Sequence, residues 1–353
     1  MSTEIERESF LRNLVLVRPA VANQAYIAAL THFFFDGVSV TAYNDVAAIS
    51  VRTSLDLVLC LPADNLQKIL NSLSADKVMV TQAEAGSVTL SAGRSKIKLP
   101  TMTAEDFPFE LPVSDPYGTF KVSDAMLRGI EKCLVGVGQD PTHPAQMGIT
   151  IESDGTLYST DNFTISRYRI AGKIPLPGNS PVIMPTFFCQ QLLALAKAFP
   201  DEPVEIDIRT ESLVAVIGEQ ATLFTKLLVD VEPMNFSHII NRHLEGEDLS
   251  DLLMDIPDGF DSAFDRALLI LSGDIDKATK LSVKDGRLKL YSSSQNGESS
   301  DTLILKVPDT EAIHVDPSLV SRSSKICRKI ALLPKVMVMA DGGFTHLIAH
   351  CSV

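Results

Sequence analysis

A strand–helix–strand pattern of apolar and polar residues lies between residues 181 and 208. Four large apolar side chains recur there at the spacing of one helix face, and they are Phe188, Leu192, Leu195 and Phe199. Pro185 can open this helix because the first turn does not use the missing N–H, whereas Pro200 cannot continue it. Apolar and acidic residues then alternate over residues 204–208, as in a strand with one solvated face. The pattern therefore predicts a strand, a helix and a second strand.

The same pattern occurs twice more, at residues 57–80 and 312–339. Pro62, Pro185 and Pro317 open the three helices, and the distance between them is that of whole domains and not of a solenoid repeat. Further helices and short alternating strands surround each unit. We therefore predict an α+β protein made of three tandem copies of one domain, each with two helices and an antiparallel sheet. The expected domains are residues 1–115, 116–242 and 243–353.

Three Asp-Gly pairs stand at equivalent places between predicted strands, where this dipeptide suits a tight hairpin turn. They are residues 36–37, 154–155 and 285–286. The sixth predicted helix carries apolar residues as far as Leu333. The acidic stretch 241–258 is weakly patterned and is expected to be a linker. Residues 293–300 are polar and are expected to form a solvated loop.

Composition agrees with a protein of two or three domains that stays in the cytosol. The chain has 353 residues, 45% of them hydrophobic and 21% charged, with no apolar run near the ~20 residues of a membrane helix. Its N-terminus lacks the basic and then apolar pattern of a signal peptide. The five cysteines are scattered without a CxxC pair, so we expect reduced thiols. The net charge of −13 argues against binding of nucleic acid over the whole outer surface.

No catalytic motif is present in the sequence. A phosphate-binding GxxxxGK[ST] loop, an HExxH zinc motif and a GxSxG elbow are all missing. His346 and His350 are four residues apart, which places both side chains on the same face of a predicted strand. They could form a metal pair there, but exposed strand histidines are the simpler interpretation. No catalytic site is therefore recognised in the sequence, and we expect neither a cofactor nor a metal.

Basic residues lie opposite the apolar stripes of the predicted helices. They are Arg12, Lys68, Arg128, Lys132, Lys197, Arg266, Lys325 and Arg328. Only Glu8 and Asp64 add negative charge near these faces of the predicted helices. Because the chain has 44 acidic and 31 basic residues, an ordinary solvated helix face would lean acidic. The bias therefore favours six helices on a surface that faces a polyanion, with the ordinary solvated face as the alternative.

Residues 93–108 read GRSKIKLPTMTAEDFP and resemble the end of the first domain of the bacterial DNA polymerase III beta subunit, the sliding clamp. Further segments resemble the family in the same order, at residues 5–8, 139–140, 160–161 and 224–230. The resemblance covers almost the whole chain and weakens after Asp309.

This resemblance implies a DNA clamp fold and a head-to-tail homodimer that closes into a ring around double-stranded DNA. Such a ring is a polymerase processivity factor without catalytic activity, held on DNA by topology and independent of sequence. Its implied partners are the replicative DNA polymerase and a clamp loader, in the nucleoid-associated cytoplasm of a bacterium or a phage-infected cell. The resemblance also implies that Gln139 faces DNA. A weakly basic lining and an acidic exterior suit a ring that slides.

The resemblance further implies an apolar groove between the second and third domains, where partners insert a short linear motif. The implied groove residues are Thr160, Asn162, Phe163, Thr164, Ile165, Pro233, Phe236, His238, Ile239, Leu347, Ala349, His350 and Cys351. Ala349 and Cys351 are smaller than the methionines of the family pattern. We therefore expect an altered side-chain preference in this groove, unless neighbouring side chains refill it and leave the specificity unchanged.

A second function from another class stays open at this stage. A clamp-fold scaffold or decoy could bind replication proteins without encircling DNA. The basic helix faces favour the sliding clamp over this alternative.

Overall fold

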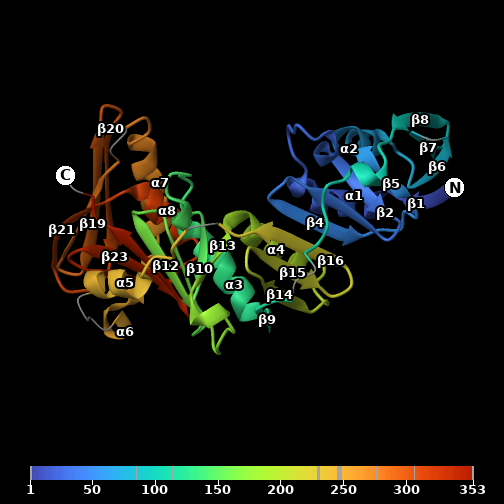
Figure 1. Cartoon of the computed structure of the whole chain (residues 1–353). Coiled ribbons are helices and arrows are strands. Elements are labelled where there is room, and N and C mark those ends of the chain that lie inside the picture. Colours follow the sequence, from blue (N-terminus) through green and yellow to red (C-terminus); the bar gives the residue numbers. More distant parts are fainter. Residues whose placement is uncertain are drawn as a thin grey trace. The chain divides into compact units, whose positions relative to one another are not determined.

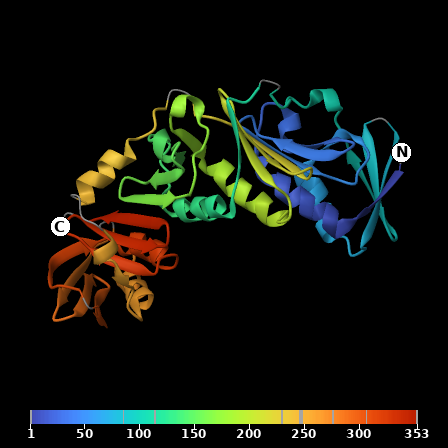
Figure 2. The ribbon, with the colours of Figure 1, turned by 90° about the horizontal axis from the view of Figure 1, so that it is seen from below.

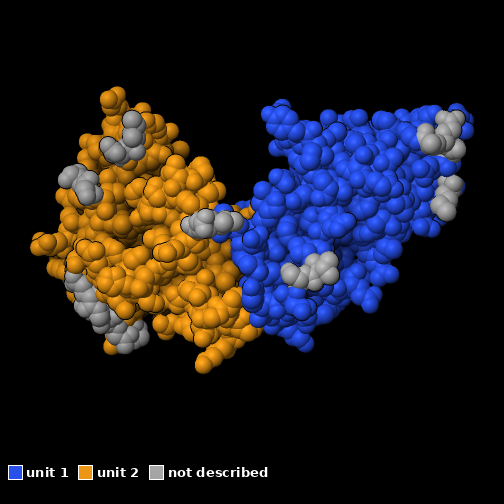
Figure 3. Space-filling view, viewed as in Figure 1, with its two compact units in different colours: residues 1–123, 190–229 blue, residues 124–189, 230–353 orange. Residues whose placement is uncertain are grey.

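The computed structural model describes residues 2–84, 86–112, 115–228, 231–244, 249–274, 277–305 and 307–351. It divides into two compact units (Figure 3). Unit 1 comprises residues 1–123 and 190–229, and unit 2 comprises residues 124–189 and 230–353. Residues 116–242 contribute to both units, and the division into three tandem domains stays a prediction.

Unit 1 is built on an antiparallel sheet with the strand order β5-β2-β3-β4-β16-β15-β14-β9 (Figure 1). Its strands are β2 (His32–Asp36), β3 (Ser39–Tyr43), β4 (Ala47–Arg52), β5 (Val58–Pro62), β9 (Gly118–Lys121), β14 (Val204–Ile208), β15 (Ser212–Ile217) and β16 (Ala221–Lys226). A second sheet has the order β1-β6-β7-β8. It consists of β1 (Ser2–Glu6), β6 (Lys77–Glu84), β7 (Ser87–Ala92) and β8 (Ser95–Pro100). In the longer sheet β4 pairs with β16, which joins segments far apart in the sequence.

Two helices cover one face of the longer sheet in unit 1. Helix α1 (Arg7–Val17) packs on β3 and β4, and α2 (Ala63–Ser72) packs on β2 and β5. Figure 2 shows these blue helices along one side of the blue strands. Their buried residues are Phe10, Leu14 and Val17 on α1, and Ala63, Leu66 and Leu70 on α2. Short 3-10 helices span Arg18–Ala20, Ala28–Thr31 and Ala104–Asp106.

Unit 2 repeats this plan with the strand order β13-β10-β11-β12-β24-β23-β22-β17. The strands are β10 (Gly148–Ile151), β11 (Thr156–Thr160), β12 (Thr164–Arg169), β13 (Val182–Pro185), β17 (Met254–Asp255), β22 (Lys329–Leu332), β23 (Val336–Asp341) and β24 (Phe344–Ala349). The other sheet has the order β20-β19-β18-β21. It consists of β18 (Thr279–Lys284), β19 (Arg287–Ser294), β20 (Gly297–Ile304) and β21 (Thr310–Val315). Here β12 and β24 make the long-range pairing.

The helices of unit 2 are α3 (Asp124–Cys133), α5 (Phe236–Leu244), α6 (Leu249–Leu252), α7 (Phe260–Ile270) and α8 (Pro317–Ser324). Helix α4 (Thr186–Ala198) begins in unit 2 and ends in unit 1. Short 3-10 helices span Leu134–Gly136, Pro144–Gln146 and Pro177–Asn179. In the described part of the chain, no helix has both the length and the apolar character that crossing a membrane requires.

The predicted α+β class is confirmed, and so are the first two strand–helix–strand units, β5–α2–β6 and β13–α4–β14. In the third unit β21 and α8 form as predicted, but the predicted strand that follows is β23, and β22 precedes it. All three Asp-Gly pairs form hairpin turns, between β2 and β3, β10 and β11, and β18 and β19. Glycine suits these turns because φ is positive, at 89° for Gly37, 85° for Gly155 and 69° for Gly286.

Two predicted loops were wrong, because their polar composition concealed secondary structure. The expected linker 241–258 instead contains the end of α5, then α6 and β17. Ile240 and Leu244 lie four residues apart on α5 and pack in one apolar cluster, against which Leu252 of α6 also packs. The expected polar loop 293–300 is the hairpin end of β19 and β20, which pair down to Ser294 and Gly297.

The end of the sixth predicted helix was also wrong. Helix α8 stops at Ser324, and Lys329–Leu332 form the strand β22. Ile330 and Ala331 are both buried there. A short run of apolar residues fits a helix end as well as a buried strand, so spacing alone did not separate them.

His346 is fully buried, which overturns the expectation of an exposed strand histidine. It lies on β24 opposite Ser166 of β12, and its Nδ1 is 2.9 Å from the Ser166 hydroxyl. Burial lowers the pKa of His346 to about 4. The folded protein therefore holds a neutral imidazole in its core at neutral pH.

The His346 pKa predicts an acid-sensitive core. The unfolded chain has a histidine pKa near ~6.5, so it binds more protons than the folded chain between pH ~4 and ~6.5. This contribution is complete above pH ~6.5, and about 3 kcal/mol is lost as the pH falls to ~4. Urea unfolding over this range should give a smaller pH-dependent loss for His346→Gln than for the parent. Identical losses would contradict this assignment.

Candidate DNA-facing and partner-binding sites

The predicted DNA-facing cations of unit 1 are exposed. Arg12 lies on α1 and Lys68 on α2, each away from the residues that its helix buries against the sheet. Lys197 lies in the last turn of α4 and is also exposed. Amphipathic spacing alone places these side chains in solvent, because the apolar stripe fixes the opposite face.

The predicted cations of unit 2 differ in their surroundings. Arg128 on α3 is exposed, as is Gln139 in the segment after it. Arg266 on α7 is half-exposed. It donates two hydrogen bonds to Asp301, from Nε to Oδ2 at 3.2 Å and from Nη2 to Oδ1 at 2.6 Å. An exposed ion pair of this kind is weak and leaves guanidinium donors for a phosphate.

Lys132 is not the solvent-facing residue that its helix position predicts. Only 19% of its side chain is exposed, and its ammonium group forms an ion pair with Asp341. The ammonium also lies 5.5 Å from the centroid of the Phe344 ring. These contacts tie α3 to β23 and β24, so Lys132 has a structural partner that the sequence did not reveal.

Lys325 and Arg328 are exposed, but they do not lie on a helix face as predicted. Lys325 is the C-cap of α8, and Arg328 lies in the turn before β22. The Arg328 side chain is 87% exposed, with Nε 3.7 Å from Asp341. Asp341 therefore contacts both Lys132 and Arg328. Whether the predicted cations face DNA stays a prediction.

Two walls of the predicted partner groove lie together in unit 2. Ile165 pairs with Leu347 across β12 and β24, and Ala349 N donates to Phe163 O at 2.9 Å. Leu347 is buried in one apolar cluster with Phe236 of α5, and Ile165 packs against it. The structure thus brings the β11–β12 connection, α5 and the C-terminal strand β24 to one place.

The groove residues do not all reach solvent. Thr160, Thr164, Phe236 and Leu347 are buried, and Phe236 stacks on Tyr158 with ring centroids 5.0 Å apart. Ile165, Pro233, Ile239, Ala349, His350 and Cys351 are partly buried, whereas Asn162, Phe163 and His238 are exposed. The buried residues position the wall, and the exposed ones are free to meet a partner.

Asp161 fixes the shape of the loop between β11 and β12. Its Oδ1 accepts hydrogen bonds from the Thr164 N–H at 2.7 Å and hydroxyl at 2.8 Å. Arg322 of α8 contacts the other carboxylate oxygen at 3.2 Å. Asn162 takes a positive φ of 73°, which asparagine tolerates better than most residues. The loop therefore presents Phe163, 64% exposed, from a constrained backbone.

Sequence reasoning missed a further part of this region. Gln146 is buried, and its Nε2 donates to Asn162 Oδ1 at 2.6 Å. It lines a cavity of about 400 Å³ together with residues 142–145, Val231, Glu232 and Met234. No apolar periodicity marks residues 142–146, so only the fold links them to the groove loop.

The last described residues line a different cavity, of about 440 Å³. His350 and Cys351 meet Leu333 and residues 309–314 there, and Cys351 N donates to His314 O at 2.8 Å. Burial lowers the pKa of His350. Within the ranges that the structure describes, no group of three or more His, Cys, Asp or Glu side chains could hold a metal.

Reversal of Lys132 should destabilise the fold. Lys132→Glu places a carboxylate against Asp341, so we expect the free energy of unfolding to fall by about 1–3 kcal/mol. Arg128→Glu on the same helix is the matched control and should stay within ~0.5 kcal/mol of the parent. Chemical unfolding at neutral pH measures both. Equal stability of the two variants would show that the Lys132–Asp341 pair contributes nothing.

Known proteins resemble this chain in sequence over most of its length. A beta sliding clamp of Haemophilus influenzae is 23% identical over 326 residues, which cover 86% of this chain and 84% of that protein. One of Pseudomonas aeruginosa is 25% identical over 318 residues, with coverage of 85% and 83%. No protein-family model matches the chain.

Solved structures agree in fold. A DNA polymerase III beta subunit of Pseudomonas aeruginosa bound to griselimycin gives a TM-score of 0.86 at 21% identity, with 100% of both chains covered. The DNA polymerase III beta subunit of Thermotoga maritima gives 0.83 at 14% identity, with 100% of this chain and 99% of that chain covered. The resemblance in the sequence is thus confirmed: this chain is similar to the bacterial beta sliding clamps over most of its length, and it has their fold.

Proposed function

We propose that this chain is a DNA polymerase processivity clamp that encircles duplex DNA as a ring-shaped homodimer. The observation that carries this proposal is that the helices of a chain with a net charge of −13 and the fold of the sliding clamps expose cations, namely Arg12, Lys68, Arg128, Lys197 and Arg266. Such a ring retains DNA by topology. It needs only weak phosphate contacts, which let the duplex slide.

The proposed ring places three domains in each subunit, at residues 1–115, 116–242 and 243–353. Two sheet edges have the properties that head-to-tail closure requires. Strand β8 is the edge of one sheet and exposes Lys96 and Lys98, and β20 is the edge of another and exposes Glu298. Ile304 at the end of β20 is 76% exposed. Pairing of β8 with β20 of a second copy would match these charges and cover that side chain.

A clamp of this kind catalyses no reaction, and its residues act only by binding DNA and partner proteins. Lys68, Arg128 and Lys197 would attract phosphates and release counterions without reading bases. Opening of the ring and its loading would fall to a separate clamp loader in the cytoplasm.

Charge reversal of the lining tests this function. Lys68→Glu, Arg128→Glu and Lys197→Glu in one chain should shorten retention on nicked circular duplex DNA by about tenfold or more at moderate salt, because phosphate contacts are lost. The control reverses Lys121, Lys173 and Lys284, which are also exposed but lie outside the helices. Light scattering should give the mass of two chains for all three proteins.

Two results would contradict the proposal. One is a parent protein that is a monomer at micromolar concentration. The other is a lining variant that stays on circular DNA as long as the parent and the control.

We further propose that the replicative polymerase and the loader dock a linear motif in the groove formed by the β11–β12 loop, α5 and the C-terminal strand. Phe163 and His238 are exposed there, and the cavity at Gln146 adjoins Asn162. Ala349 and Cys351 offer less apolar surface than methionine would. The side-chain preference should therefore differ from that of a groove built with methionines.

A fluorescent peptide of the QLxLF type tests the groove and its preference. We expect it to bind more than about tenfold more weakly than a motif peptide from the cognate polymerase. Phe163→Asp should weaken the cognate peptide by about tenfold, since a charge enters an apolar contact. Leu269→Asp, on α7 with 73% of the leucine exposed, is the matched control. Tight QLxLF binding that Phe163→Asp abolishes would confirm the site and refute the altered preference.

A further inference from the structure

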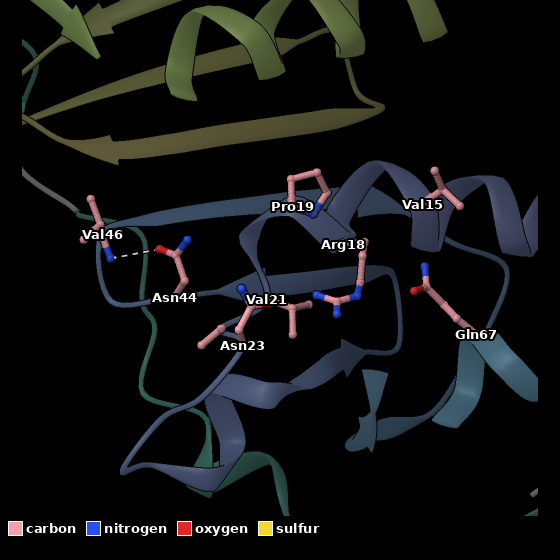
Figure 4. Close-up of a pocket in the computed structure, with 9 residues that line it drawn as sticks. Val15, Arg18, Pro19, Val21, Asn23, Asn44, Val46 and Gln67 are labelled. Carbon is pink, nitrogen blue, oxygen red and sulfur yellow. Dashed lines mark hydrogen bonds between the residues drawn. The ribbon is translucent and has the colours of Figure 1, made fainter. Parts of the chain in front are cut away.

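A cavity of about 770 Å³ lies in unit 1, apart from the proposed partner groove (Figure 4). The end of α1, the 3-10 turn after it, the β3–β4 turn and α2 form its walls. Its volume is within the range of sites that bind small organic groups. Polar side chains enter from several of these walls, as Figure 4 shows for Arg18, Asn23, Asn44 and Gln67.

The polar side chains of this cavity combine amides with one cation. Asn44 Oδ1 accepts hydrogen bonds from Val46 N at 3.1 Å and from Ala47 N at 2.8 Å, which holds the amide in place and leaves its NH₂ group for a ligand. Within the described ranges, the amides of Asn23 and Gln67 have no hydrogen-bond partner. An amide both donates and accepts, so these groups can bond the edge of any nucleobase.

Arg18 supplies a positive charge that is only partly used. Its Nη2 donates to Asp64 Oδ1 at 2.6 Å, and both side chains are partly exposed. A guanidinium carries five N–H donors, so it can bond a phosphate while it keeps this contact. Asp64 fixes the guanidinium at the cavity wall.

Two residues that line the cavity are close in the chain to cations that we propose face the duplex. Val15 lines it and follows Arg12 by three residues on the exposed side of α1, and Gln67 directly precedes Lys68 on α2. A strand that leaves the duplex at this surface would meet the cavity next.

An exposed aromatic ring lies three residues after Asn23, which lines the cavity. The chain continues from Asn23 into a loop closed by the hydrogen bond from Ala22 N to Leu30 O at 3.0 Å. Tyr26 in this loop is fully exposed, and Ile27 is about half exposed. Exposed aromatic rings give bases a stacking surface that does not depend on sequence.

We propose that this cavity, with Tyr26, binds unpaired nucleotides of a DNA strand. Amides for base edges, a guanidinium for phosphate and an aromatic ring for stacking are the groups that single-strand sites combine. A peptide ligand is less favoured, because the apolar residues that line the cavity are all small and offer no deep pocket for a large side chain; they are Val15, Pro19, Val21, Ala22 and Val46. The inference rests on the proposed function for the direction from which the strand arrives.

Fluorescence anisotropy with a labelled oligonucleotide of about 12 thymidines, within the ~4–16 nucleotides that single-strand modules cover, tests the proposal on the full chain. The parent should bind it, and binding should fall about tenfold in Asn23→Ala/Gln67→Ala and in Tyr26→Ala. Asn71→Ala, an exposed amide on α2 outside the cavity, should bind like the parent. A duplex of the same length should not distinguish the cavity variants from the parent.

The outcomes separate this proposal from the sliding clamp. A parent that stays on circular duplex but does not bind the oligonucleotide overturns the cavity site and leaves the clamp intact. Oligonucleotide binding that the cavity variants leave unchanged overturns it too. Oligonucleotide binding that these variants lose supports the cavity, even if the parent is not retained on circles.

Discussion

Main-chain pairing between strands far apart in the sequence is the constraint on which the rest of this fold depends. Strand β4 pairs with β16, and β12 pairs with β24, over five residue pairs each. Each pairing closes a long antiparallel sheet from two segments of the chain. A shift of one residue would turn every side chain to the other face, so the apolar faces under the helices hold the register.

The helices follow from these sheets. Because α1 and α2 each bury one stripe on the same sheet, their remaining sides face water and are free to carry charge. This is why periodicity alone placed Arg12, Lys68 and Arg128 in solvent. It failed for Lys132, since the contact with Asp341 joins α3 to a strand more than two hundred residues later. No local pattern encodes such a contact.

The predicted partner groove also depends on contacts that no local sequence pattern encodes. Similarity to a family pointed to the β11–β12 loop, residues 233–239 and the C-terminal strand, and the structure brings residues of all three together. The inward direction of Phe236 and the link from Gln146 to Asn162 depend on tertiary packing. Polar segments were the hardest to predict, because the acidic residues around α6 hide the leucines that pack on the apolar cluster.

The pairing of β4 with β16 also bears on how the protein is made. A ribosome releases β4 well before β16, so the edge of the first sheet stays unpaired until about residue 226 has emerged. The same holds for β12, which waits for β24 near the end of the chain. Unpaired edges of this kind favour aggregation. Synthesis of this chain therefore includes two intervals in which open sheet edges must be shielded, and a shortened chain that ends between the paired strands would keep such an edge permanently.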